Sequence, residues 1–253
     1  MADSTISLKQ WKVIDLTHPL DSNMPIWPGD PAVDITAWAS YEKDRYLSHR
    51  ISIGEHSGTH WGTPNTFIKG ARSADLFTPD ELVIPAVVIN IQAISARDND
   101  YRLSIDDINL WEKKNGKIPS GSMVVLLTGW QNRWKNSRSF LGLGDRQICH
   151  WPGFGIDAVT FLIYTRGIKG LGTDTHGIDS GTDQHFSASM AMYHADGMIL
   201  ECLTNLDQLP ATGSTLVIGG WPIVGGTGSP ARVLAFIPPG KESTIRPESN
   251  DFE

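Results

Sequence analysis

The most informative segment of this sequence is His56-Ser57-Gly58-Thr59-His60-Trp61-Gly62-Thr63-Pro64. Its two histidines stand four residues apart, so both imidazoles can chelate one metal ion if the chain curls between them. Neutral imidazole is a common ligand of zinc and manganese. The glycines and the proline argue against a continuous helix, so we expect this segment to be a loop. The spacing leaves open a second interpretation, in which both histidines only form hydrogen bonds within the loop.

Two later segments supply further candidate groups. Asp174 and His176 alternate just after an apolar strand, which suits a metal ligand or a general base with its orienting carboxylate. An Asp-rich turn with a hydrogen-bonded histidine is the alternative. Glu201 ends the apolar run Met198-Ile199-Leu200, where a carboxylate is costly unless it is paired or metal-bound. The alternative for Glu201 is a buried ion pair with Arg232.

The composition excludes several classes of protein. The chain has 253 residues, 40% of them hydrophobic and 19% charged, which is typical of a globular protein with a substantial core. No apolar run approaches the roughly 20 residues that span a bilayer. The formal net charge is −7 and the basic residues are scattered, so we expect neither a nucleic-acid partner nor a membrane-surface role.

Cysteine usage and the first residues bear on the compartment. Cys149 and Cys202 are the two cysteines and form no CxxC pair, which excludes a disulfide scaffold and a thiolate zinc cluster. The opening MADSTISLKQ lacks the basic and apolar blocks of a signal peptide. We therefore expect a cytoplasmic protein.

Short apolar strands recur along the chain, and helices are fewer. Strands are predicted at 12–16, 33–38, 47–53, 85–91, 123–128, 170–173, 198–201, 215–218 and 233–237. Helices are predicted to start at Thr78 and at Ser104, and to cover 157–166 and 186–196. The interleaved elements predict an α/β or α+β layered fold rather than an all-β one.

Four segments together resemble one known family. They are VIDLTHPL at 13–20 with MPIWPGDP at 24–31, HSGTH at 56–60 with Pro64, GTDTHGID at 172–179, and ECLTNLDQLP at 201–210. In this order they resemble the cyclase superfamily, which includes bacterial kynurenine formamidases and isatin hydrolases. The resemblance implies a swivelling β/β/α fold with a mixed sheet core and few helices. It implies one domain over 1–253, with a core at about 13–238 and a polar tail at 239–253, and a homo-oligomer, dimer or tetramer.

The family's site motif reads His-x-Gly-Thr-His-x-Asp-x-Pro-x-His, in which the first two histidines and the aspartate bind zinc or manganese. This chain keeps both ligand histidines but has Gly62 at the aspartate position and Thr66 at the position of the catalytic histidine. Ser189 stands at the position of a later family histidine, which His185 or His194 would fill if the alignment slips, whereas Glu201 matches the family's glutamate. The chain is therefore expected to be a divergent member.

These considerations define the candidate site. The candidate ligands of a divalent metal, zinc or manganese, are His56, His60, Asp174 and Glu201. The candidate catalytic residues are His60, His176 and Glu201, and the candidate substrate-binding residues are Trp27, Trp61 and His18.

The expected function is a metal-assisted hydrolase of a small amide, formamide, lactam or lactone. One alternative is a metal-independent lyase, dehydratase or isomerase that uses the histidine cluster for acid–base chemistry. Another is a non-catalytic binding or structural member of the family.

Overall fold

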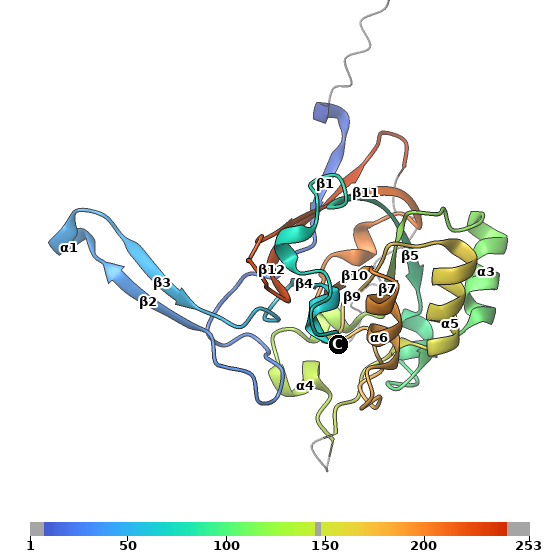
Figure 1. Cartoon of the computed structure of the whole chain (residues 1–253), viewed down its shortest axis with the longest axis horizontal. Coiled ribbons are helices and arrows are strands. Elements are labelled where there is room, and N and C mark those ends of the chain that lie inside the picture. Colours follow the sequence, from blue (N-terminus) through green and yellow to red (C-terminus); the bar gives the residue numbers. More distant parts are fainter. Residues whose placement is uncertain (1–7, 145–147, 242–253) are drawn as a thin grey trace, which may run out of the picture.

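A single mixed sheet forms the centre of the molecule (Figure 1). The computed structural model describes residues 8–144 and 148–241. The sheet has eight strands in the order β1-β12-β11-β5-β7-β9-β10-β4, and β12 also pairs with β4. That extra pairing closes seven of the strands into a ring, with β1 beside it. The strands are β1 (Lys12–Asp15), β4 (His60–Gly62), β5 (Val83–Asn90), β7 (Met123–Leu127), β9 (Gly170–Thr173), β10 (Met198–Glu201), β11 (Thr212–Gly220) and β12 (Gly228–Ile237).

The side chains of this sheet form two hydrophobic cores. On β7, Met123, Val125 and Leu127 join one core and Val124 and Leu126 join the other, because successive side chains of a strand point to opposite faces. The first core draws on strands all around the ring and therefore fills its inside. The second lies beneath the helices. A strand that is covered on both faces explains the unbroken apolar run of β7.

Three helices cover the outer face: α3 (Ile105–Asn115), α5 (Ile156–Phe161) and α6 (Ser187–His194). Helix α3 begins at a capping box, in which the Ser104 hydroxyl accepts from Asp107 N and the Asp107 carboxylate accepts from Ser104 N. Helix α5 continues into the π-helix η5 (Leu162–Arg166). The short helices are α1 (Tyr41–Asp44), α2 (Gln92–Ser95) and α4 (Ser137–Leu141), with 3-10 turns η1 (Leu8–Gln10), η2 (Pro64–Thr66), η3 (Ala74–Leu76), η4 (Trp130–Arg133) and η6 (Leu206–Gln208).

A two-stranded hairpin stands away from the body as an arm (Figure 1). It consists of β2 (Asp34–Ala39), β3 (Ser48–Ser52) and the helix α1 between them. Most of its strand residues are exposed, including Trp38 and Ile51. A second small pair, β6 (Arg102–Leu103) with β8 (Gly153–Phe154), is parallel.

The structure confirms the predicted mixed class and all nine predicted strands, and it corrects two local predictions. No helix begins at Thr78. Glu81 accepts hydrogen bonds from the Thr78 backbone and hydroxyl, but the chain then enters β5 at Val83. The segment after His56 is not wholly a loop, because His60 opens strand β4.

Three further points concern the expected organisation. The single-domain organisation stays a prediction. The predicted polar tail lies outside the described residues from position 242 onward. Within the described part of the chain, no helix is both long enough and apolar enough to cross a bilayer.

Candidate active site

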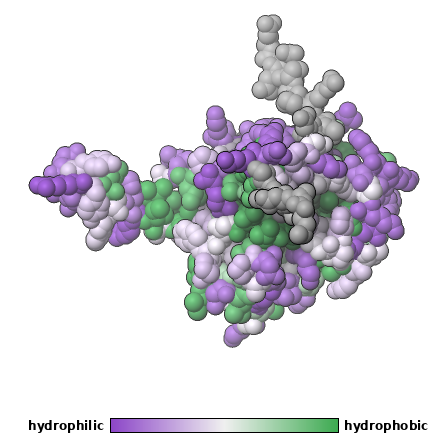
Figure 2. All heavy atoms as spheres, turned by 90° about the horizontal axis from the view of Figure 1, so that it is seen from above, coloured by the Kyte–Doolittle hydropathy of each residue, from purple (hydrophilic) through white to green (hydrophobic). Residues whose placement is uncertain are grey.

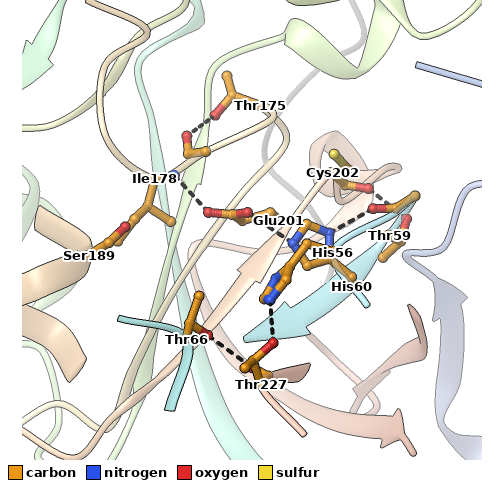
Figure 3. Close-up of polar contacts among 12 residues, drawn as sticks. His56, Thr59, His60, Thr66, Thr175, Ile178, Ser189, Glu201, Cys202 and Thr227 are labelled. Carbon is orange, nitrogen blue, oxygen red and sulfur yellow. Dashed lines mark hydrogen bonds and ion pairs between the residues drawn. The ribbon is translucent and has the colours of Figure 1, made fainter. Parts of the chain in front are cut away.

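Strand register places the first pair of functional groups. In the antiparallel pair of β10 and β4, Glu201 lies directly opposite His60. Directly opposed side chains project from the same face of a sheet, and here His60 Nε2 lies 3.0 Å from Glu201 Oε2. The other carboxylate oxygen accepts from the backbone N–H of Ile178 at 3.2 Å (Figure 3). Two segments far apart in the sequence are thus joined at the ends of their strands.

The hydrogen-bond partners of His60 and Glu201 indicate where the protons of this pair lie. His60 Nδ1 donates to the Gly58 carbonyl at 2.9 Å, because a carbonyl can only accept. Nε2 faces a carboxylate, so one more proton lies between His60 and Glu201. Burial opposes the charge of Glu201, but the His60 hydrogen bond and the surrounding histidines outweigh it and hold the pKa of the carboxyl below its usual value. The pair therefore shares this proton, and Glu201 is held toward its charged form.

A tight turn brings His56 beside His60. Gly58 adopts φ +65°, where a side chain is strained, and a Cβ there would lie 2.6 Å from Leu20 Cδ2. The turn sets the two imidazole rings 5.2 Å apart and nearly perpendicular. The proximity predicted from the two-histidine spacing is therefore present.

A hydrogen-bond chain fixes the tautomer of His56. The Thr227 hydroxyl donates to the Glu55 carboxylate, so its oxygen is left to accept from His56 Nε2 at 2.9 Å. Burial, helped by the charge of His60, lowers the pKa of His56 to about 4. At neutral pH His56 is therefore an uncharged ring whose Nδ1 carries a lone pair.

His176 is the second uncharged imidazole of the site. It is 3% exposed, and neither ring nitrogen has a hydrogen-bond partner among the described residues. Its ring packs against Trp27, Trp151 and Phe140 at centroid distances of 5.5, 6.2 and 5.9 Å. Burial lowers its pKa to about 4. Because buried polar atoms are rarely left unpaired, this ring is poised to bond a ligand.

These groups face one pocket of about 240 Å³. Aromatic and polar side chains line it together, as in many small-molecule sites. The lining consists of Trp27, Asp30, His56, His60, Thr66, Phe67, Trp151, His176, Gly177, Asp179, Ser180, Gly181, Asp183, Phe186, Ser189, Tyr193 and Glu201. All three candidate catalytic residues and the candidate substrate-binding residue Trp27 are therefore brought together.

Three other candidates lie elsewhere. Asp174 is fully buried and accepts hydrogen bonds from Thr128 and Gln131, which corrects its assignment as a metal ligand. Trp61 belongs to the core inside the ring and donates to Ser229, so it is not a substrate contact. His18 stacks on Trp134 with 4.0 Å between centroids and lines a different hollow.

The open alternative for Glu201 is also resolved. Arg232 pairs with Asp15 at 2.6 Å and not with Glu201, whose partner is His60.

Several site residues were not predicted from the sequence. Tyr193 lies one helical turn after Ser189 on α6, and that spacing was the signal that could have found it. Phe67 and Phe186 form part of the wall, and their rings stack 5.1 Å apart. The sequence also did not predict Thr227, which bonds His56, or Glu55, which bonds Thr227.

The positions where the family has histidines carry hydroxyls with structural roles. The Thr66 hydroxyl contacts the carbonyl of Thr63 at 2.7 Å and that of Thr227 at 2.9 Å, and Figure 3 shows the contact with Thr227. The Ser189 hydroxyl donates to Asp179, which also accepts from the first backbone N–H groups of α6. Neither hydroxyl is free to replace the missing imidazole.

The residues present do not fit the divalent metal that the family resemblance implies. At position 62, where the family has its aspartate ligand, a Cβ would collide with Tyr193 Oη, so the phenol occupies the space of the missing carboxylate. His56 Nε2 bonds Thr227 and His60 Nδ1 bonds Gly58, so only His56 Nδ1 and His60 Nε2 could face a metal, and His60 Nε2 is already paired with Glu201. Over 8–144 and 148–241, no group of three His, Cys, Asp or Glu side chains is arranged to hold a metal ion. The expected zinc or manganese therefore lacks its ligand set.

Several known proteins are similar to this chain in sequence and in fold. Residues 14–180 match the Cyclase family model, described as "Putative cyclase". An isatin hydrolase from Roseibium aggregatum is 35% identical over 90% of this chain and 92% of its own length. A kynurenine formamidase from Erythrobacter litoralis is 23% identical over 79% of this chain and 82% of its own length.

Solved structures agree with these matches. Isatin hydrolase A from Labrenzia aggregata, bound to benzyl benzoate, superposes with a TM-score of 0.86 at 33% identity and covers 92% of this chain and 96% of its own. A potential metal-dependent hydrolase with cyclase activity superposes with a TM-score of 0.68 at 24% identity, over 89% of this chain and 98% of its own. At this identity the likeness shows the fold alone. The expected cyclase-type fold is confirmed.

The contact between position 62 and Tyr193 is testable. We expect Gly62→Ala to destabilise the protein by about 1–3 kcal/mol, because the new methyl group overpacks the phenol. In the Tyr193→Phe background the same substitution should cost clearly less, since the clashing oxygen is gone. Urea unfolding of the four proteins of this double-mutant cycle measures the difference. An equal cost in both backgrounds would contradict the assigned contact.

Proposed function

The chain belongs to the cyclase family, and we propose that it hydrolyses a small amide, formamide, lactam or lactone that bears an aromatic group. The observation that carries the proposal is the ion pair of His60 and Glu201, held by strand register at the end of an aromatic-walled pocket. The relatives support the reaction class, because isatin hydrolase and kynurenine formamidase are named for opening a lactam and cleaving a formamide.

Glu201 is the general base of the proposed reaction. Its charged carboxylate lines the pocket, and its bonds to His60 and Ile178 hold it in place. A water molecule that donates to this carboxylate gives up a proton as its oxygen attacks the carbonyl carbon. The C–N or C–O bond then breaks, and the proton passes to the leaving nitrogen or oxygen. His60 orients the carboxylate and keeps it charged.

Two uncharged donors can stabilise the oxyanion. Burial raises the pKa of Tyr193 well above its usual value, so the phenol keeps its proton. His176 carries one N–H with no partner among the described residues. Fixed donors in a pocket that excludes water stabilise the charge that develops on a carbonyl oxygen.

No step of this mechanism is assigned to a metal. The family's zinc or manganese would need a third ligand in the place that the Tyr193 phenol occupies. Acid–base chemistry by the histidines and Glu201 uses groups that the site does contain. The proposal thus keeps the hydrolase reaction and makes it metal-independent.

We also propose a homo-oligomer in which the β2–β3 arm packs on a second copy of the chain. A two-stranded hairpin is marginally stable alone in water. This one exposes Ile35, Trp38, Tyr46 and Ile51. Figure 2 shows hydrophobic residues gathered where the arm meets the body. A partner subunit would cover these side chains.

Replacing the base tests the mechanism. We expect Glu201→Gln to lower kcat/KM by ~10²–10⁴, because the amide cannot accept the proton of water. Asp106→Asn, at an exposed carboxylate on α3, is the matched control and should leave the rate unchanged. Isatin, an uncharged lactam, is the first substrate to assay. A fully active Glu201→Gln protein would reject the assigned base, and absence of turnover across aromatic amides and lactones would reject the function.

Metal removal tests the second part of the proposal. We expect protein purified without added metal to hold less than about 0.1 equivalent of zinc or manganese, because two imidazoles alone bind such ions weakly. Its hydrolysis rate should survive dialysis against a chelator. Elemental analysis and the chelated assay provide the measurements. Inactivation that zinc or manganese reverses would show that the reaction needs a metal after all.

The proposed role of the arm in assembly can be tested by measuring the mass of the protein in solution. Sedimentation equilibrium should give a dimer or larger assembly for the wild-type chain. The double variant Trp38→Glu/Ile51→Glu should shift it to monomer, because the charges oppose burial of the arm. Leu110→Glu, at an exposed apolar site on α3, is the control and should not change the mass. A monomeric wild-type protein would overturn the proposal.

A further inference from the structure

The pocket is lined by acidic side chains, and His60 is paired with one of them. Carboxylates are contributed by Asp30, Asp179, Asp183 and Glu201, and no Lys or Arg is among the described lining residues. The charge of Glu201 is matched by His60. Asp30 and Asp183 form no salt bridge within the described chain, but exposed Arg102, which contacts Thr182, also acts on Asp183 through its charge. The pocket is therefore a region of negative potential.

The walls add aromatic faces to that potential. Trp27 and Phe186 lie 6.1 Å apart, and Phe186 stacks on Phe67. The face of an aromatic ring is negative and attracts cations, whereas it offers nothing to an anion. These side chains are only partly buried, so a flat ring can lie against them.

An unpartnered imidazole points to the ligand independently of these charges. The neutral ring of His176 has one donor nitrogen and one acceptor nitrogen, both without partners in the described structure. The two nitrogens point away from each other across the ring, so one ligand group bonds only one of them. A neutral amide or lactam pairs with either nitrogen, through its C=O or its N–H, whereas a carboxylate pairs with the donor nitrogen alone.

From these observations we propose that the pocket selects uncharged or cationic aromatic amides and excludes those that carry a carboxylate. The inference rests on the proposed function and names its substrate class. Asp30 and Asp183 supply the discrimination, and His176 recognises the amide.

The same charges act on the product. Hydrolysis adds water across the C–N bond and yields an amine and a carboxylic acid, which loses its proton at neutral pH. A carboxylate formed beside Asp30 and Asp183 is repelled. The pocket is therefore expected to bind its acid product more weakly than its substrate.

Three matched probes test the selection. They are acetanilide, 4-(aminomethyl)acetanilide and 4-acetamidobenzoate, which share one amide and differ in charge. Binding to the wild-type protein is measured by calorimetry, and hydrolysis is assayed separately. We expect the anionic probe to bind at least about tenfold more weakly than the cationic one, with the gap narrowing as salt screens the charges.

Variants locate the effect. Asp30→Asn/Asp183→Asn should reduce the gap between cationic and anionic probes to within about threefold, because only charge is removed. Asp157→Asn, at an exposed carboxylate on α5, should leave the gap unchanged. Equal binding of the charged probes, binding of none of the three, or an unaltered gap in the double variant would overturn the inference. The proposed function fails separately, if the binding order holds but no aromatic amide or lactam is hydrolysed.

Discussion

The cross-strand pair of His60 and Glu201 is the interaction on which the rest of the site depends. It exists because β4 and β10 pair in one register, and a shift of β4 by one residue would send His60 to the opposite face, away from Glu201. A carboxylate at the end of a buried strand is costly unless it is paired, and the ring of His60 supplies that partner. The same contact that makes Glu201 tolerable in the fold leaves it charged and ready to accept a proton.

The neighbourhood of Gly62 is where this chain departs most from the family's site motif. A glycine leaves room for the Tyr193 phenol, which faces the histidine pair where the family places a carboxylate. An acidic ligand is thereby exchanged for an uncharged hydrogen-bond donor. With hydroxyls also at positions 66 and 189, the site has lost charged and basic groups together. Such a joint change suits a different chemical strategy better than random decay.

Much of the fold could be predicted because its strands are short, apolar and bounded by glycine or proline. Strand β4 could not, since its three residues carry no alternation and its partners lie far along the chain. His176 and Glu201 were found because a polar group in an apolar run needs a reason. Asp174 was found for the same reason, but its carboxylate serves the fold by accepting hydrogen bonds from Thr128 and Gln131. The sequence did not predict the pocket residues Phe67, Phe186 and Tyr193, because an aromatic residue is most simply interpreted as part of the hydrophobic core.

Closure of the ring has a consequence for how the protein is made. β4 is completed by β12, which ends at Ile237, and Thr227 just before that strand fixes the tautomer of His56. The parallel strands can assemble on the ribosome as they emerge, but the ring closes only after β12, the last of its strands in the sequence, has been made. A chain that stops before Thr227 would lack both the strand that pairs with β4 and the hydroxyl that bonds His56.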